Sequence, residues 1–245
     1  MATPLDPSPT EHWNRVYRHR EPAVLSEDDH TALCALRHFG GVDGARVLDL
    51  GCGTGEYSRF FATRGAVVVA VDRSPIAVAG LRDRCVTDGI RTVHPVVADA
   101  FGISALGRFD LVFGSMILHH IEPFGRFVDV LADSMTAGGR AFFAENSSMS
   151  RFLVWCREHL VGRFGIPKNS DEDEFPLRPD EVDMLRRRFD VSVEHPRMLL
   201  TGLASGYLLH GHADRELAWI DDQLSRFERF RRLSYLQHVL LIAPL

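Results

Sequence analysis

The sequence predicts an α/β protein built on a doubly wound, Rossmann-like parallel sheet. Strand-like and helix-like segments alternate over residues 46–145, a pattern typical of parallel strands covered by helices on both faces. The first apolar run leads into a glycine-rich turn, Asp49-Leu50-Gly51-Cys52-Gly53-Thr54-Gly55. The second run ends in an acid, Asp72. A strand, a glycine turn and a helix N-terminus together present backbone N–H groups to a ligand.

Five runs in this region are predicted to be strands, because they are short, apolar and bounded by turn residues. Their ranges are about 46–50, 67–71, 93–98, 109–114 and 139–145. Helices are predicted over about 56–64, 75–88 and 124–136, with a short turn near 103–106. Ser74 and Pro75 suit the start of the second helix, as a capping hydroxyl and a first-turn proline. Gly138 and Gly139 are expected to end the helix before the fifth strand.

Outside this region the sequence predicts helical additions. Residues 1–45 are expected to form an N-terminal helical cap, with helices over about 11–20 and 27–39. The main domain is predicted to be 46–245, with helical insertions at 146–178 and 198–233, after the fifth and sixth strands. The remaining elements are a helix over about 181–188 and strands over about 189–194 and 235–243.

Composition excludes several classes of protein. A formal net charge of −5 over 245 residues argues against a broad nucleic-acid surface. The four cysteines contain no Cys-x-x-Cys, so neither zinc nor a disulfide framework is indicated. His210-Gly211-His212 lacks a third ligand in view and favours a polar loop over a metal site. No apolar run is long enough to span a bilayer and no signal peptide is recognised, so a cytoplasmic protein is expected.

The spacing of the glycine turn separates the possible ligands. A phosphate-binding P-loop needs Gly-Lys-Ser/Thr, but Gly55 is followed by Glu56 and Tyr57. A dinucleotide fingerprint needs a glycine where Glu56 stands, which disfavours a nicotinamide oxidoreductase. Asp49, before the first glycine, would repel a pyrophosphate but suits a ligand with an ammonium group. Asp72 is placed to bind two ribose hydroxyls.

These features together resemble the class I S-adenosylmethionine-dependent methyltransferases, whose first motif is an acid followed by Gly-x-Gly-x-Gly. The resemblance covers about residues 46–145. It implies a seven-stranded sheet whose last strand is antiparallel and lies between strands five and six. It also implies S-adenosylmethionine as cofactor, S-adenosylhomocysteine as product, and an acceptor pocket built by the two insertions.

The resemblance assigns roles to particular positions. It implies that Asp49 lies near the methionine amino group and that Asp72 binds the ribose. It implies that the loop under the cofactor consists of Gly51, Gly53 and Gly55. It implies that the adenine is contacted by Arg73, Asp99, Ala100 and Phe101, and the methionine end by Ser115 and Met116. Asp99 also suits a helix N-cap. Trp13 and Tyr17, on the first predicted helix, either touch the cofactor or pack in the core.

A pair of histidines follows the fourth strand, in Ile117-Leu118-His119-His120-Ile121. Methyltransferases of the quinone-biosynthesis type carry a similar Leu-His-His-Ile stretch here. Histidine titrates near neutrality and can take a proton from an acceptor hydroxyl or hold it by a hydrogen bond. Because adjacent side chains on a turn point apart, we expect His120 to act on the acceptor and His119 to be structural. A hydrogen bond between loop and sheet is the alternative for either.

The predicted reaction is methyl transfer from S-adenosylmethionine to a small, partly apolar acceptor by in-line displacement. O-methylation is favoured over C- or N-methylation. The alternative from another class is a non-catalytic S-adenosylmethionine-binding module or partner subunit with the same fold. No metal is expected, and the chain is expected to be a monomer or homodimer.

Overall fold

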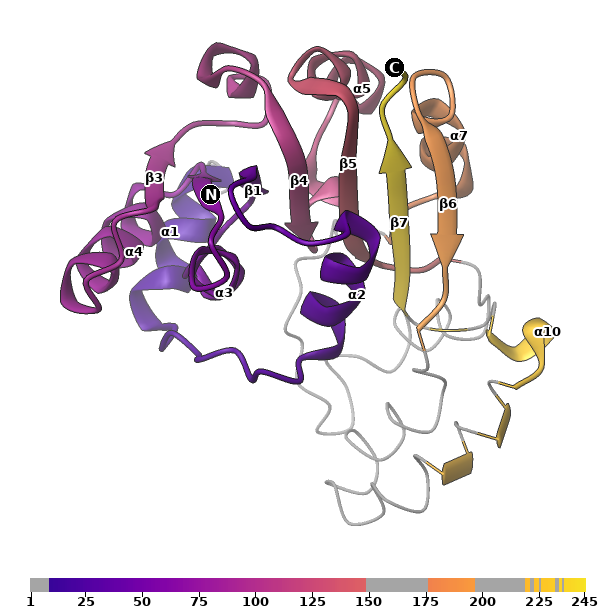
Figure 1. Ribbon diagram of the computed structural model, residues 1–245, viewed down its shortest axis with the longest axis horizontal. Coiled ribbons are helices and arrows are strands. Elements are labelled where there is room, and N and C mark those ends of the chain that lie inside the picture. The colour runs from indigo at the N-terminus through magenta and orange to yellow at the C-terminus, as the bar shows by residue number, and fades with distance from the viewer. Residues whose placement is uncertain are drawn as a thin grey trace, which may run out of the picture.

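The computed structural model describes residues 9–148, 176–196, 219–220, 223–224, 226–231, 234 and 236–245. Its centre is a seven-stranded sheet with the order β3-β2-β1-β4-β5-β7-β6 (Figure 1). The strands are β1 Arg46–Leu50, β2 Val67–Asp72, β3 Val93–Val97, β4 Phe109–Ser115, β5 Met135–Asn146, β6 Asp190–Glu194 and β7 Leu236–Ile242. The helices are α1 Pro9–His19, α2 His30–Phe39, α3 Glu56–Ala62, α4 Pro75–Thr87, α5 Phe124–Asp133, α7 Pro179–Leu185 and α10 Glu228–Arg231, with 3₁₀ turns η1 Ile103–Leu106 and η2 Leu118–His120.

The strand directions match the predicted fold. Strands β1 to β5 pair in parallel, whereas β7 pairs antiparallel with both β5 and β6. The last strand therefore lies between the fifth and sixth, as the resemblance implied. The doubly wound α/β fold is confirmed.

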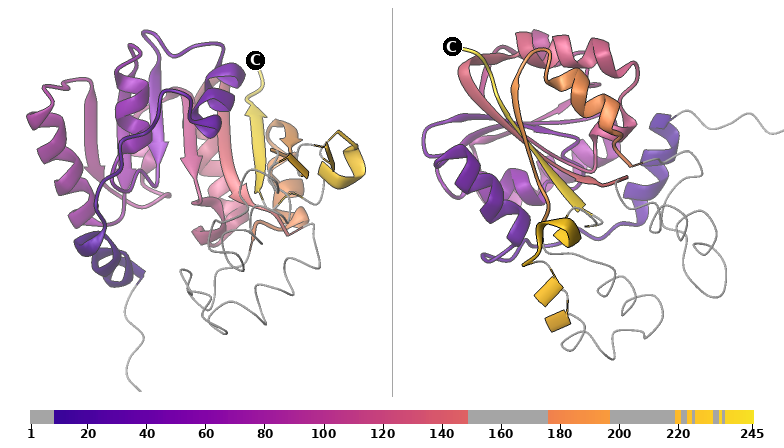
Figure 2. Two further views of the ribbon diagram at one scale, coloured as in Figure 1. Left: turned by 90° about the horizontal axis from the view of Figure 1, so that it is seen from below. Right: turned by 90° about the vertical axis from the view of Figure 1, so that its right-hand side faces the viewer.

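Helices cover both faces of the sheet, with α2, α3 and α4 on one side and α5 and α7 on the other (Figures 1 and 2). Neighbouring residues of a strand enter different cores: Val47 belongs to the same core as Phe61 and Leu81, and Leu48 belongs to the same core as Phe127 and Leu185. Both faces of the central strands are thus buried, which explains why they read as nearly continuous apolar runs.

Two helix starts follow from their capping residues. Ser74 accepts a hydrogen bond from the N–H of Ala77, and Pro75 occupies the first turn of α4, as predicted. Helix α2 begins at His30 rather than near residue 27, because the side chain of Asp29 accepts from the N–H of Ala32 at 2.8 Å. A satisfied cap of this kind fixes the first turn of a helix.

The predicted boundary before the fifth strand is wrong. Helix α5 ends at Asp133, and β5 begins at Met135 and contains both Gly138 and Gly139. The pairing of β5 with β4 shifts register after Phe109, so the strand bends there. Gly138 has φ +70°, and a Cβ on Gly139 would lie 2.9 and 3.0 Å from two carbonyl oxygens. The glycines therefore serve the bend in the strand and not a helix end.

Most of the two predicted insertions lie outside the described residues, as do Trp155 and His210-Gly211-His212. Within the described part, Trp219 and Phe227 are exposed. The domain boundary at residue 45 and the covering role of the insertions stay predictions.

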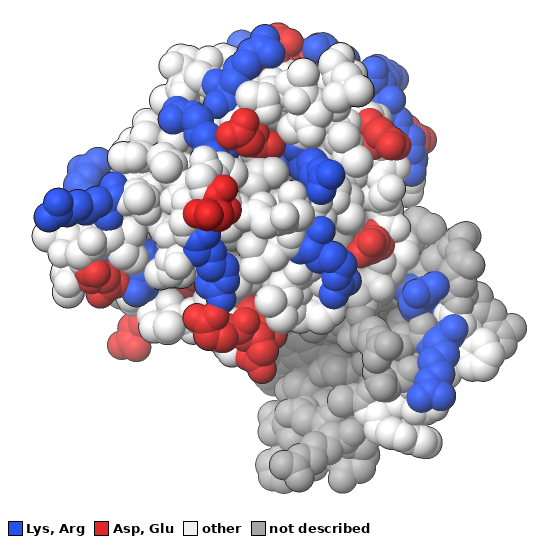
Figure 3. Space-filling model, viewed as in Figure 1, with Lys and Arg blue, Asp and Glu red and all other residues white. Residues whose placement is uncertain are grey.

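The described surface carries mixed charge. On the face shown in Figure 3, acidic and basic side chains are interspersed. Among the described residues no helix has the length and apolar character needed to cross a membrane. The same residues bring together no group of three histidine, cysteine, aspartate or glutamate side chains fit for a metal ion.

Candidate cofactor and acceptor site

A cavity of about 340 Å³ lies where the carboxyl ends of β1, β2 and β4 meet, the position at which doubly wound sheets bind ligands. Its walls come from α1, the glycine turn, the loop after β3 and the turn after β4. The sequence-predicted residues that line it are Trp13, Tyr17, Gly51, Gly53, Asp72, Arg73, Asp99, Ala100, Phe101, Ser115, Met116 and His120. Three other predicted residues, Asp49, Gly55 and His119, are not part of the lining.

The three glycines of the turn have different tasks, although all have positive φ. A Cβ on Gly51 would lie 2.7 Å from the side chain of Ile117, and one on Gly53 would lie 2.9 Å from the Tyr17 hydroxyl. These two glycines let the turn after β4 and helix α1 approach the loop. A Cβ on Gly55 would lie 2.2 Å from Leu81 instead, so Gly55 serves the packing of α4 against the loop.

Asp72 joins the end of β2 to the glycine turn. Its Oδ2 accepts from the N–H of Gly53 at 2.9 Å and its Oδ1 from the N–H of Ser74 at 2.8 Å. Burial raises the pKa of this carboxyl, and the two N–H donors oppose the rise. Because each carboxylate oxygen has two acceptor sites, Asp72 can hold the turn and still accept from two hydroxyls in the cavity.

Asp49 lies beneath the loop rather than in the cavity. The side chain is 2% exposed and accepts a hydrogen bond from the hydroxyl of Ser58. Burial raises the pKa of Asp49 to about 7. The implied contact with a methionine amino group stays a prediction.

Asp99 lies at the rim on the β3 side. Its Oδ1 accepts from the N–H groups of Phe101 and Gly102, both at 2.9 Å. Asp99 thus holds the turn after β3, but it is not a helix N-cap, because η1 begins at Ile103 and has Gly102 at its N-cap. Asp99 lines the cavity as well, and its implied contact with the adenine stays a prediction.

Helix α1 borders the cavity through two aromatic residues. The rings of Trp13 and Tyr17 stack with centroids 5.8 Å apart, and the rings of Trp13 and His120 are nearly perpendicular, with centroids 5.2 Å apart. Burial raises the pKa of the Tyr17 phenol above its ordinary value, and the nearby charge of Asp72 raises it further. The two aromatic residues thus both pack and line the cavity.

The two histidines do not point apart, contrary to the expectation from their adjacency. Their ring centroids are 4.1 Å apart. They occupy a single 3₁₀ turn in which Glu145 holds His119 against the sheet and Trp13 borders His120. Only His120 lines the cavity. His119 makes the hydrogen bond between loop and sheet that was the alternative reading.

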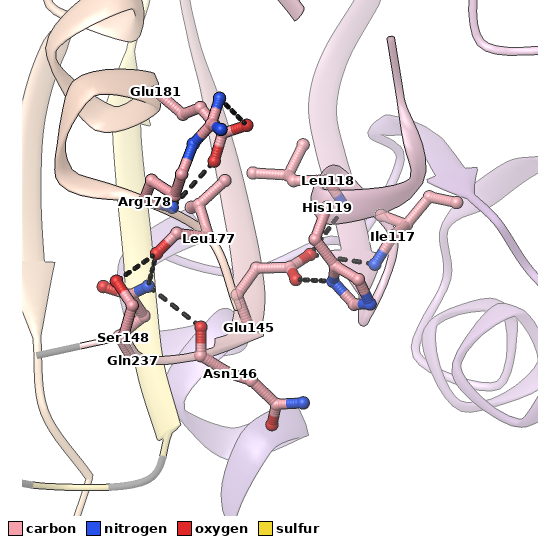
Figure 4. A network of polar contacts seen from close by, with 10 residues as sticks. All are labelled: Ile117, Leu118, His119, Glu145, Asn146, Ser148, Leu177, Arg178, Glu181 and Gln237. Carbon is pink, nitrogen blue, oxygen red and sulfur yellow. Dashed lines mark hydrogen bonds and ion pairs between the residues drawn. The ribbon is translucent and has the colours of Figure 1, made fainter. Parts of the chain in front are cut away.

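Glu145 was not singled out from the sequence. It is fully buried, and Figure 4 shows its carboxylate facing the turn after β4. Oε1 accepts from the N–H groups of Ile117 and Leu118 at 2.8 and 2.7 Å, and Oε2 lies 2.6 Å from Nδ1 of His119. The only available signal was a lone acid closing the apolar run Ala141–Ala144.

Other lining residues were also missed. Tyr57 lines the cavity and packs on Phe113 with ring centroids 4.5 Å apart, and burial raises its pKa to about 12. Arg20 and Glu122 lie at the wall as well. Neither belongs to a local motif, so nothing in the sequence marked them.

Comparisons with known proteins agree with this geometry. A family model described as "Methyltransferase domain" matches residues 47–139. The ubiquinone biosynthesis O-methyltransferase of Aromatoleum aromaticum is 30% identical over 162 residues, covering 64% of this chain and 68% of the relative. That of Alkalilimnicola ehrlichii is 28% identical over 167 residues, covering 66% and 65%. The N-methyltransferase NodS of Bradyrhizobium japonicum, solved with S-adenosylhomocysteine, has a TM-score of 0.60 at 13% identity, covering 96% and 98%.

Fold and cavity together define a nucleoside-binding α/β protein of the methyltransferase type. The chain belongs to the class I S-adenosylmethionine-dependent methyltransferases, of the quinone-biosynthesis-like type. The resemblance drawn from the sequence is thereby confirmed. The matched part spans 65% of the length of the Alkalilimnicola ehrlichii relative, and 60% of that of the ubiquinone biosynthesis O-methyltransferase of Idiomarina loihiensis.

Proposed function

We propose that the chain catalyses methyl transfer from S-adenosylmethionine to a small, partly apolar acceptor, with oxygen as the favoured methyl acceptor. The observation that carries the proposal is that one cavity is lined by Asp72, at the position of a ribose-binding acid, by the glycine turn and by His120. The names of the relatives support O-methylation.

The residues present fit the cofactor. Asp72 keeps acceptor capacity for two ribose hydroxyls while holding the turn. Ala100 and Phe101 offer an apolar side to the adenine, with Asp99 at the rim. Arg20 supplies a cation for the carboxylate of the methionine tail. When bound, S-adenosylmethionine supplies a methyl group on a positively charged sulfonium, open to in-line displacement.

The chain itself contributes position, exclusion of water and a proton acceptor. Trp13 and Tyr17 border the cavity and restrict solvent, which favours a displacement reaction. His120 lies on the same wall as Ser115 and Met116. Its imidazole receives the proton that an acceptor hydroxyl loses.

The test is turnover of a panel of phenols, other hydroxyl compounds and amines, using methyl-labelled cofactor and detection by mass spectrometry. His120→Ala should lower turnover of a hydroxyl acceptor by about 100- to 10,000-fold, the range for a positioned base. Binding of S-adenosylhomocysteine should be unchanged. His94→Ala, at an exposed position of β3, is the control and should behave as wild type.

Equal turnover in wild type and His120→Ala would show that His120 takes no part in the reaction. Partial recovery in His120→Gln would show that holding the acceptor matters more than taking its proton. Binding of cofactor without turnover of any acceptor would favour the non-catalytic alternative. The proposed setting is the cytoplasm, with the chain as monomer or homodimer, and no nucleic-acid acceptor is proposed because the net charge is −5.

A further inference from the structure

The turn after β4 has an unusual backbone. Met116 has φ +54°, the one positive value among the described residues other than glycine, and its side chain is 38% exposed at the cavity. Such a conformation persists only where the surroundings enforce it. The N–H of Met116 donates to the carbonyl of Ala144 at 2.8 Å. The next two N–H groups, of Ile117 and Leu118, both donate to Glu145.

Glu145 stands on a rigid support. It lies in β5 between β4 and β7. Just beyond it, the side-chain amide of Gln237 donates to the carbonyl oxygens of Asn146 and Leu177 at 3.1 and 3.3 Å (Figure 4). A carboxylate held on a fixed strand can set the geometry of a neighbouring loop.

A full charge is more than the turn alone requires. Two backbone N–H groups can be satisfied by a neutral oxygen, and burying a carboxylate is costly unless further donors surround it. The further donor here is His119, whose side chain is 4% exposed and whose Nδ1 lies 2.6 Å from Oε2. We therefore take the imidazole of His119 to be the group that an ionised Glu145 serves, in addition to the turn.

The contact also selects one form of the imidazole. An ionised carboxylate accepts hydrogen bonds only, so Nδ1 of His119 must carry a hydrogen. When the ring is neutral, Nε2 of His119 then carries no hydrogen. The ring so fixed touches the ring of His120, which lines the cavity. A continuous series of contacts thus leads from Glu145 through His119 to the cavity wall.

We propose that Glu145 is a positioning residue for methyl transfer. Acting through Nδ1 of His119, it fixes the histidine ring against which His120 is oriented, and it holds the turn that carries both. The inference rests on the proposed function of His120. It adds a residue that does not itself touch the acceptor.

The first experiment compares Glu145→Gln with Glu181→Gln in the full chain. Glu181 is also buried, and its carboxylate accepts from the N–H of Arg178 at 2.7 Å as part of the cap of α7. Figure 4 shows it on α7, apart from His119. One amide cannot accept from both N–H groups and also from Nδ1–H. We expect E145Q to lower kcat by about 10- to 100-fold, by analogy with the carboxylates that orient metal-binding histidines, whose mutation has an effect of that size. The affinity for S-adenosylhomocysteine should be unchanged. E181Q should keep wild-type kcat.

The second experiment reads the imidazole directly by nitrogen-15 NMR of the histidine side chains. In wild type the hydrogen of His119 should reside on Nδ1. In E145Q the amide N–H faces Nδ1, so the hydrogen should move to Nε2, and the resonances of His120 should shift with it. This measurement needs no acceptor. If the wild type turned over no acceptor while these spectral changes appeared, the proposed methyl transfer would be contradicted. The contact between Glu145 and His119 would still be supported.

His119→Asn guards against misfolding of E145Q, because its amide can still donate to Glu145 while the ring contact with His120 is lost. It should retain the wild-type Tm and lower kcat to about the level of E145Q. The inference is overturned by a wild-type kcat in H119N, by His119 protonated on Nε2 in wild type, or by E145Q matching E181Q in kcat and in both histidine spectra.

Discussion

At the scale of single residues, three buried carboxylates near the cavity have different partners and different uses. Asp72 accepts from the N–H of Gly53 in the glycine turn and from that of Ser74, and it lines the cavity. Asp49 lies beneath the turn with Ser58. Glu145 holds the turn after β4. Their surroundings, not their residue type, separate the acid that lines the cavity, Asp72, from the two that do not.

Asp49 gives a prediction on the pH dependence of stability. Burial raises its pKa from 3.8 to about 7, so the folded state binds the proton more tightly than the unfolded state. Stability from this group is present below pH about 4 and is lost as the pH rises through about 7. That displacement of the pKa corresponds to about 4 kcal/mol of folding free energy.

Asp49→Asn keeps an oxygen that accepts from Ser58 but cannot ionise. Its free energy of unfolding at pH 8 should exceed that of wild type by up to about 4 kcal/mol, and the gap should close near pH 4. Urea unfolding across this range is the measurement. Asp83→Asn, at an exposed position of α4, is the control. A gap independent of pH would contradict the assigned cause.

The sequence could identify residues of the site only where spacing carries the signal. Asp72 and the glycines were predictable because they follow fixed strand ends within one unit of the fold. Glu145 was not, since its partners lie 26 to 28 residues earlier in the chain. Contact between the histidine rings was also missed, because it depends on the shape of the turn.

At the scale of elements, the glycine turn offers a matched comparison. Gly55 and Gly89 have φ +80° and +69°, but a Cβ would strike Leu81 at Gly55 and meet nothing within 4 Å at Gly89. Both alanine variants carry the same backbone penalty. Gly55→Ala should therefore be less stable than Gly89→Ala by about 1–3 kcal/mol, the range for overpacking. Equal urea midpoints would show that Leu81 moves aside freely.

The contact between α1 and the turn gives a second prediction at this scale. A Cβ on Gly53 would lie 2.9 Å from the Tyr17 hydroxyl, so Gly53→Ala should displace α1 and weaken binding of S-adenosylhomocysteine. Removing the hydroxyl in the double variant with Tyr17→Phe should restore part of the affinity, since residues in contact are coupled. The measurement is calorimetric titration of the single and double variants with S-adenosylhomocysteine. Additive losses would contradict the contact.

Element boundaries were predictable where a local cap decides them. Ser74 and Pro75 marked the start of α4 correctly. Gly138 and Gly139 suggested a helix end by the same local logic, yet they serve the bent start of β5. That bend depends on pairing with β4, which no local pattern records.

At the scale of the whole molecule, the sheet places its ligand cavity and its supporting acids at one edge. The parallel core follows from the alternation of strands and helices. The antiparallel place of β7 between β5 and β6 could not be derived from the alternation and came from the resemblance alone. Carboxyl ends of β1, β2 and β4 then bring Asp72 and His120 to one cavity.

The central claim is that this cavity binds S-adenosylmethionine through Asp72, and calorimetric titration of the full chain with S-adenosylhomocysteine tests it most directly. Wild type should bind at micromolar concentration and should give no heat with NAD. Asp72→Ala, checked for folding by circular dichroism, should bind more weakly by about 10- to 150-fold for each lost hydrogen bond, since bonds to charged groups contribute about 1.5–3 kcal/mol. Absence of heat in wild type, or unchanged affinity in the folded variant, would contradict the account.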